Sequence, residues 1–306
     1  MEHHHPARKK HSHQRHSHAG DNLLIATVLN ITITIVEVAG GLLSNSIALL
    51  SDALHNFGDS IAVFLAYVSN KISQKGPSAK KTFGYKRVEI MAAMLNSLIL
   101  VVICAYLLYE SWHRMINPKP VQGLIMTIVA TVGLLANLFA VFLLHKDKNR
   151  NINIKAAYLH LLSDTVSSIG VVIGGLLIYF YKIYWIDPII TIIISLYIFK
   201  ETWGILKQAY LILIQAAPEG VEIDDILEVL ERYEEIENVH HVHIWKLNDT
   251  EIHFECHIDM KNNVRLSETE ELMHRIKKIL FEKFNIVHTT IQFEYNCCDD
   301  KSIIYK

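Results

Sequence analysis

The chain reads His55-Asn56-Phe57-Gly58-Asp59 and, much later, His160-Leu161-Leu162-Ser163-Asp164, each inside a long apolar run. Both segments have the form His-x-x-x-Asp, and positions i and i+4 share one face of a helix. Two such faces together offer two imidazoles and two carboxylates, a tetrahedral ligand set that suits Zn²⁺. Because ionisable groups inside a bilayer are costly, these pairs predict an intramembrane metal site.

The composition divides the 306-residue chain into an apolar part and a charged part. The chain is 51% apolar, and Asp, Glu, Lys and Arg are scarce before Gln215 and frequent after it. This contrast predicts a membrane domain followed by a soluble domain. A net charge of −2 and the lack of a basic-aromatic stripe argue against nucleic-acid binding. The four cysteines lack a disulfide-framework spacing, which indicates a reducing compartment for the soluble part.

Six apolar runs are long enough for a spanning helix, which needs about 20 residues. They lie at about 22–43, 47–71, 88–113, 121–145, 155–181 and 186–210. The first has no cleavage pattern, so we interpret it as a retained span and not as a signal peptide. Lys and Arg gather in alternate connections, so the positive-inside rule predicts that both termini lie in the cytoplasm. We expect the membrane to be a plasma (bacterial inner) membrane. The two polar pairs then meet near the bilayer midplane, where an alternating-access carrier binds its substrate.

The N-terminal tail is rich in histidine. Residues 1–20 contain seven histidines and no apolar periodicity, which predicts disorder. Two explanations remain open for this tail, metal collection or no role, and residues 3–5 are either native or a tag. We favour metal collection for residues 11–18.

The soluble part alternates between helical and strand patterns. The predicted order is helix, strand, strand, helix, strand, at about 223–230, 239–246, 251–260, 267–284 and 286–295. Ser267 and Glu270 have capping-box spacing and are expected to open the second helix. This order predicts a small α+β domain of the metallochaperone or ferredoxin-like type.

The predicted strands share a polar face with many imidazoles. Its members are His240, His241, His243, His253, Glu255, His257, His288, Gln292 and Glu294. A solvated sheet face is the simpler explanation, but so many imidazoles near carboxylates favour a metal site.

Five segments of the chain, in order, resemble the zinc-transporting branch of the cation diffusion facilitator family. They are residues 46–59 (SIALLSDALHNFGD), 83–89 (FGYKRVE), 156–164 (AAYLHLLSD), 242–245 (VHIW) and 290–294 (TIQFE). The resemblance extends over about residues 22–296. It implies a homodimer of six-helix protomers that exchanges metal ions for protons across the lipid bilayer.

The resemblance also implies two kinds of metal site. The transport site is expected to contain His55, Asp59, His160 and Asp164. The cytoplasmic domain is expected to bind zinc and to help hold the dimer. There, His240, His257 and Glu294 match ligand positions of similar proteins, and Gln292 replaces a histidine. The substitutes for that histidine are His288, Cys297 and Cys298, and we expect a site of His240, His257, His288 and Glu294.

These inferences give four expected regions. They are a histidine-rich tail (1–21), a six-helix transmembrane domain (22–212), a cytoplasmic metal-binding and dimerisation domain (213–296) and a C-terminal tail (297–306). The expected function is export of Zn²⁺, and of Cd²⁺, in exchange for protons, with zinc also as a structural or regulatory ligand.

Three alternatives to this function remain. One is an Fe²⁺ or Mn²⁺ exporter of the same family, which the histidines disfavour because all-oxygen sites suit Mn²⁺. Another is a membrane zinc sensor without flux. The last is an intramembrane zinc hydrolase, which commonly shows His-Glu-x-x-His and keeps a water position at the metal. The chain has no such motif, so we expect no enzyme.

Overall fold

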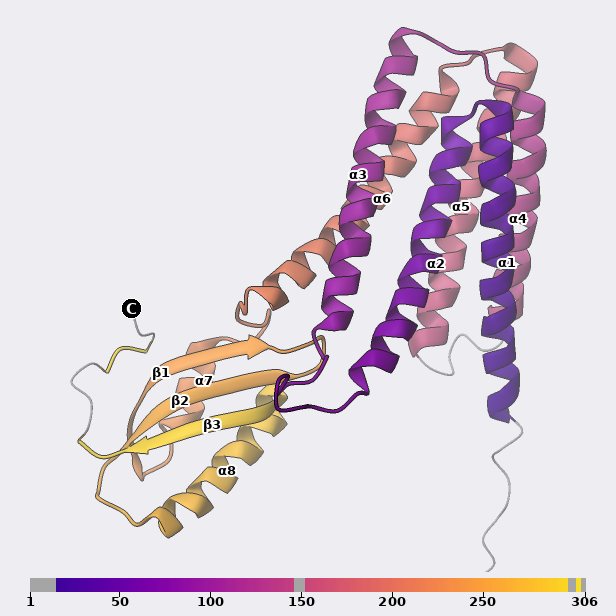
Figure 1. Ribbon diagram of the computed structural model, residues 1–306. Coiled ribbons are helices and arrows are strands. Elements are labelled where there is room, and N and C mark those ends of the chain that lie inside the picture. The colour runs from indigo at the N-terminus through magenta and orange to yellow at the C-terminus, as the bar shows by residue number, and fades with distance from the viewer. Residues whose placement is uncertain (1–14, 146–151, 297–300, 304–306) are drawn as a thin grey trace, which may run out of the picture. The chain divides into compact units, whose positions relative to one another are not determined.

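The computed structural model contains six long helices followed by a small α+β fold (Figure 1). It describes residues 15–145, 152–296 and 301–303, with backbone alone for 15–27, Asn70, 152–154 and Ala156. The chain divides into two compact units. Unit 1 contains Met1–Phe64 and Leu98–Trp203, and unit 2 contains Leu65–Ser97 and Gly204–Lys306.

Six helices overlap the six predicted spans, but the first begins at Arg15, so the prediction of disorder was wrong for residues 15–20. They are α1 (Arg15–Ser44), α2 (Ile47–Ser73), α3 (Val88–Ile116), α4 (Gly123–His145), α5 (Ile152–Tyr181) and α6 (Ile186–Leu213). Among the described residues, α3, α4, α5 from Ala157, and α6 are long and apolar enough to cross a membrane. The part of α1 with described side chains, Val28–Ser44, is shorter. The first half of α2 carries Asp52, His55 and Asp59, which lower its hydropathy.

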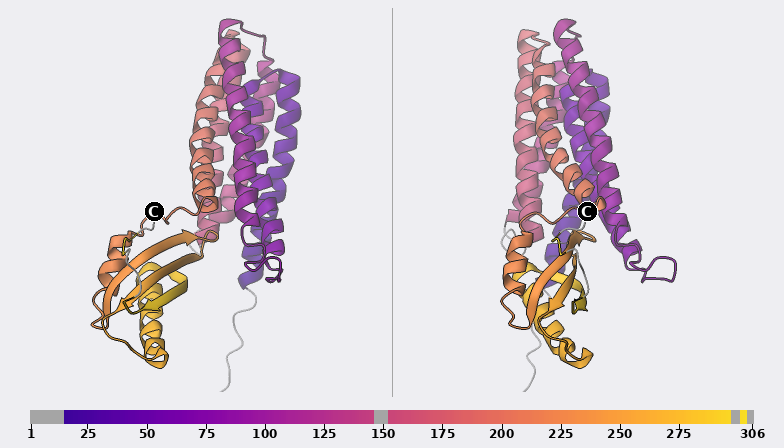
Figure 2. Two further views of the ribbon diagram at one scale, coloured as in Figure 1. Left: turned by 60° about the vertical axis from the view of Figure 1, so that its left-hand side comes forward. Right: turned by 90° about the vertical axis from the view of Figure 1, so that its left-hand side faces the viewer.

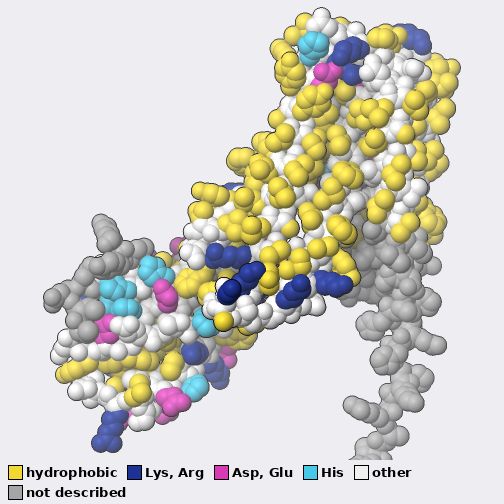
Figure 3. Space-filling view, in the orientation of Figure 1, with side chains coloured by type: hydrophobic (Ala, Val, Ile, Leu, Met, Phe, Trp, Pro, Cys, Tyr) yellow, Lys and Arg dark blue, Asp and Glu magenta, His cyan; other side chains and the backbone are white. Residues whose placement is uncertain are grey.

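The outer surfaces of these helices are apolar. Large hydrophobic side chains such as Val102, Phe142 and Ile193 are exposed, and such side chains cover the visible face of the long helices (Figure 3). Burying this surface in lipid is favourable, whereas exposing it to water is not. The protein is therefore a multi-pass membrane protein.

Close helix packing in unit 1 depends on small residues. Helix α4 packs against both α1 and α5. A Cβ at Gly175 of α5 would lie 3.1 Å from the backbone nitrogen of Thr127 in α4. Glycine therefore lets the two backbones approach closely.

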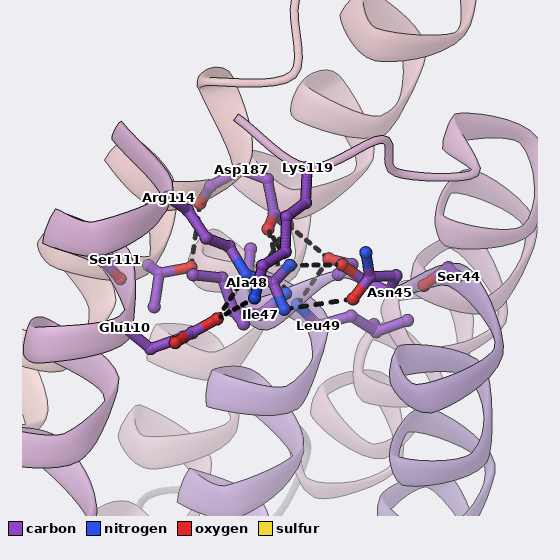
Figure 4. Close-up of polar contacts among 12 residues, drawn as sticks. Ser44, Asn45, Ile47, Ala48, Leu49, Glu110, Ser111, Arg114, Lys119 and Asp187 are labelled. Atoms are coloured by element: carbon purple, nitrogen blue, oxygen red, sulfur yellow. Dashed lines mark hydrogen bonds and ion pairs between the residues drawn. The ribbon is translucent and has the colours of Figure 1, made fainter. Parts of the chain in front are cut away.

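A polar network fixes the beginning of α2 (Figure 4). Asp187, in the first turn of α6, accepts hydrogen bonds from Ser46 Oγ at 2.5 Å and from two backbone N–H groups of α2 at 3.0 and 3.1 Å. Arg114 of α3 donates to the carbonyl of Asn45 at 2.6 Å. A carboxylate suits the positive end of a helix dipole. The helix that carries His55 and Asp59 is thus anchored to α3 and α6.

Unit 2 contains a three-stranded sheet in the order β1-β2-β3. Its elements are α7 (Ile223–Leu230), β1 (Ile236–Lys246), β2 (Ile252–Met260), α8 (Leu266–Phe284) and β3 (Ile286–Glu294). Strand β1 pairs antiparallel with β2, and β2 pairs parallel with β3 after the crossover helix α8 (Figure 2). This confirms the predicted αββαβ order.

The core of unit 2 lies between the helices and one face of the sheet. Phe254 and Ile258 of β2, Leu272 and Ile276 of α8, and Ile226 of α7 are all fully or almost fully buried in one cluster. The opposite face keeps the polar side chains that alternate with these residues.

Helix α8 begins two residues earlier than the capping-box pattern predicted, because its N-cap is Arg265 and not Ser267. Arg265 is the extended residue before the helix, and its backbone N–H donates to Glu268 at 3.2 Å. The prediction from Ser267 and Glu270 was therefore wrong, because Ser267 is already inside the first turn. The acceptor three residues after the true N-cap is Glu268.

Candidate metal centres

Helices α2 and α5 bring four ligand side chains together within unit 1. We call His55, Asp59, His160 and Asp164 the intramembrane cluster. The nitrogen–oxygen distances are 3.5 Å for His55–Asp59, 3.5 Å for His55–Asp164, 3.2 Å for His160–Asp59 and 3.5 Å for His160–Asp164. Two ligand bonds of about 2.1 Å at a tetrahedral angle separate their ligand atoms by about 3.4 Å. The four distances, which involve both nitrogens of His55 and both oxygens of Asp164, are close to this separation.

The four side chains of the intramembrane cluster differ in their exposure. The side chains of His160 and Asp59 are 39% and 32% exposed, whereas those of His55 and Asp164 are 9% and 2% exposed. One ligand atom from each of His55, Asp59 and His160 lies within 4.8 Å of the others. Asp164 lies outside this three-residue group, but its two oxygens each lie 3.5 Å from one imidazole on the buried side of the cluster.

Further polar side chains support the intramembrane cluster. Asp52, one turn before His55, accepts hydrogen bonds from Ser167 at 2.8 Å and Ser168 at 3.3 Å and so links α2 to α5. The ring of Tyr197 on α6 lies 6.4 Å from that of His55. Sequence reasoning missed the serines and the tyrosine, because isolated hydroxyls in a membrane helix have no distinctive spacing.

A β-bulge shapes the second group of imidazoles, in unit 2. His240 pairs with His257, but His243 pairs with Glu255, so β1 contains one extra residue. His241 has a φ of 49°, the left-handed conformation found at many bulges. The ring centroids of His240, His241 and His257 consequently lie 4.7 to 5.5 Å apart.

One carboxylate joins two of these imidazoles. Glu294 Oε1 lies 2.9 Å from His257 Nδ1, and Glu294 Oε2 lies 3.4 Å from His240 Nε2. We call His240, His241, His257 and Glu294 the sheet cluster. Asn238 Oδ1, 3.0 Å from His240 Nδ1, orients that ring. Burial lowers the pKa of His240, which keeps its lone pair available for a metal ion at neutral pH.

The sheet cluster differs from the predicted set in one member, since it contains His241 in place of His288. His288 lies beside His253, with ring centroids 4.6 Å apart, and not with the other three predicted residues. Its parallel register partner on β2 is His253, whereas that of Glu294 is Asp259. Gln292 donates to Glu294 Oε1 at 2.6 Å, so it orients the carboxylate. His241 joins the cluster because of the bulge.

Other predicted ligands lie outside the described part of the chain. Cys297 and Cys298 belong to the range 297–300, and the histidines of the tail belong to residues whose side chains are not described.

The chain matches two family models over most of its length. The cation efflux transmembrane domain matches residues 23–214, and the cytoplasmic domain of cation efflux proteins matches residues 218–296. The chain is 36% identical to the zinc transporter ZitB of Pectobacterium atrosepticum, over 95% of this chain and 90% of that protein.

Two further relatives have comparable similarity. The cation efflux system protein CzcD of an Alcaligenes species is 34% identical, over 93% of this chain and 90% of that protein. The cadmium, cobalt and zinc/H(+)-K(+) antiporter of Bacillus subtilis is 35% identical, over 92% of this chain and 91% of that protein. The family is one of transporters and not of enzymes. The chain therefore belongs to the cation efflux family, the cation diffusion facilitators, as its motifs indicated.

Proposed function

We propose that this protein exports Zn²⁺ from the cytoplasm in exchange for protons by alternating access, and that Cd²⁺ is a second substrate. The observation that carries the proposal is the intramembrane cluster, with four nitrogen–oxygen distances of 3.2 to 3.5 Å between two helices. The relatives named for zinc, cadmium and cation efflux support the same substrates.

The exchange of metal for protons follows from the chemistry of the ligands. Imidazole and carboxylate bind a metal only when they are deprotonated, so protons and Zn²⁺ compete for the same lone pairs. Metal enters the cluster past His160 and Asp59, its two more exposed members. In the alternate state protons from the opposite side of the membrane displace it.

The two histidines favour zinc over the rival metals. Nitrogen ligands suit Zn²⁺ and similar ions, whereas Mn²⁺ prefers oxygen ligands. Fe²⁺ or Mn²⁺ export within the same family is the alternative, and it predicts faster flux of those ions than of Zn²⁺.

We assign the sheet cluster a structural or regulatory role. Its neutral His240 and the shared Glu294 suit zinc, and a pocket of about 370 Å³ beside His241, His243 and His257 gives access from solvent. We propose that residues 213–296 form a cytoplasmic domain that binds metal and holds a homodimer together. We also propose that both termini are cytoplasmic and that the protein lies in the plasma membrane. The match of the cytoplasmic domain to residues 218–296 supports the first of these proposals.

The test is metal flux into proteoliposomes under an imposed pH gradient. Zn²⁺ and Cd²⁺ should be driven across the membrane, and His55→Ala should abolish their flux. Flux that ignores collapse of the gradient would reject proton exchange. Zinc binding without any flux would favour a membrane sensor.

A further inference from the structure

A second buried polar pair lies between α1 and α2, outside the intramembrane cluster. Glu37 and Asn56 are 0% and 1% exposed, and Asn56 Nδ2 donates to Glu37 Oε2 at 3.0 Å. Within the described part of the chain, Glu37 Oε1 and Asn56 Oδ1 have no hydrogen-bond partner. A Cβ at Gly133 of α4 would collide with Glu37 Oε1, so the chain keeps this space free for the carboxyl group.

The charges around Glu37 disfavour a bare carboxylate. The described charged groups that act on it are Asp52 of α2 and Asp164 of α5, and both are acidic. A buried charge without a cationic partner is strongly destabilising. Two buried acceptors without donors add a further cost.

One proton removes both problems. A carboxylic acid and an amide can form two hydrogen bonds, N–H to the acid oxygen and O–H to the amide oxygen. The first bond is present, from Asn56 Nδ2 to Glu37 Oε2. A proton on Glu37 Oε1 can be donated to Asn56 Oδ1, which satisfies both unpaired atoms and neutralises the charge.

We propose that Glu37 and Asn56 form a proton-binding site, separate from the intramembrane cluster. This site holds one of the protons that are exchanged for metal. The proposal rests on the proposed antiport function. Asn56 directly follows His55 in α2, and Asp164 acts electrostatically on Glu37, so the pair senses the charge in the intramembrane cluster. When Zn²⁺ binds, its positive charge favours the carboxylate, the O–H bond of Glu37 breaks and the proton passes to water. When Zn²⁺ leaves, a proton from the other side restores the acid.

The test is the coupling ratio of the full chain in proteoliposomes. At a fixed pH gradient, the zinc gradient at which net flux stops gives the number of protons per Zn²⁺. Glu37→Gln replaces the carboxylic acid with an amide of the same shape, which cannot release a proton. The number of protons per Zn²⁺ should therefore fall by about one while zinc flux continues. Glu89→Gln, at an exposed position of α3, should leave the ratio unchanged. An unchanged ratio in Glu37→Gln would overturn the proposal.

Two further measurements distinguish proton release by Glu37 from a purely structural role, and failure of this proposal from failure of the proposed antiport. Infrared difference spectra of the wild type should lose a carboxylic acid C=O band on zinc addition, and Glu37→Asp should shift that band. The absence of both effects would overturn the proposal even if Glu37→Gln failed to fold. A wild-type ratio of zero would instead reject proton antiport, so the two failures remain distinguishable.

Discussion

The intramembrane cluster and the sheet cluster use the same two ligand types in different proportions. The intramembrane cluster has two imidazoles and two carboxylates, so it becomes neutral when it binds a divalent ion. The sheet cluster has three imidazoles and the single carboxylate of Glu294, so a bound divalent ion leaves it with a net positive charge. A neutral complex costs less to keep inside a bilayer. The difference suits one cluster to transport and the other to binding beside water.

The largest expected effect comes from removing a carboxylate of the intramembrane cluster. Asp164→Ala deletes the residue whose oxygens contact both imidazoles, and flux of Zn²⁺ into proteoliposomes should fall by more than about 100-fold. Removal of a supporting partner alone costs about 10- to 100-fold, and removal of a ligand should cost more. Size-exclusion chromatography should show an unchanged fold. Flux at the level of the exposed-site variant Glu89→Gln would exclude this cluster as the transport site.

The matching change in the sheet cluster should have a smaller effect on flux. Glu294→Ala removes the carboxylate that joins His240 and His257, so the purified protein should bind about one zinc ion fewer per protomer. Flux should change by less than about tenfold, since the proposed transport ligands remain. Metal analysis and flux are compared on the same preparation. A loss of flux equal to that of Asp164→Ala would remove the functional distinction between the clusters.

The intramembrane cluster could be predicted from the sequence because helix geometry is regular. His55 and Asp59 are four residues apart, as are His160 and Asp164, and that spacing by itself places each pair on one face. The antiparallel arrangement of α2 and α5 then left little freedom in how the pairs meet. The anchor at Asp187 was not predicted, because a single carboxylate at a helix end resembles many others.

The sheet cluster could be predicted only in part because strand register is not regular. Alternation placed His257 and Glu294 on the polar face, but the bulge at His241 moved that residue into the cluster. Nothing in the spacing signals a left-handed histidine. The same limit explains His288, which shares the polar face but pairs with His253 at another level of the sheet.

The supporting hydrogen bonds of the two clusters offer a matched, smaller test. Ser167→Ala removes the 2.8 Å bond to Asp52 beside the intramembrane cluster, and Gln292→Leu removes the 2.6 Å bond to Glu294 in the sheet cluster. Each should weaken zinc binding at its own cluster by about tenfold. Flux titrations report the first change and metal-binding titrations the second. A change in flux for Gln292→Leu, or in zinc binding at the sheet cluster for Ser167→Ala, would show that the clusters are coupled.

The smallest expected effect is a pH dependence of the protein's stability. Its response to zinc distinguishes histidines that bind the metal from histidines that do not. Burial and His288 lower the pKa of His253, and burial lowers that of His240. The unfolded chain then binds more protons in acid, so stability is complete above about pH 6.5 and falls as the pH drops through the lowered values. The melting temperature of the full chain should therefore decrease from pH 7 to pH 5.

Added zinc should remove the part of this pH dependence that comes from His240 and leave the part that comes from His253. Bound metal holds His240 deprotonated, so zinc should suppress the contribution of the sheet cluster. It should leave the contribution of His253, whose ring contacts those of Trp245 and Phe83. His253→Phe should flatten the remaining slope, and His274→Phe, at an exposed position of α8, should not. If zinc flattened the whole curve in the wild type, His253 and His288 would have to be metal ligands too, and the sheet would hold a second site.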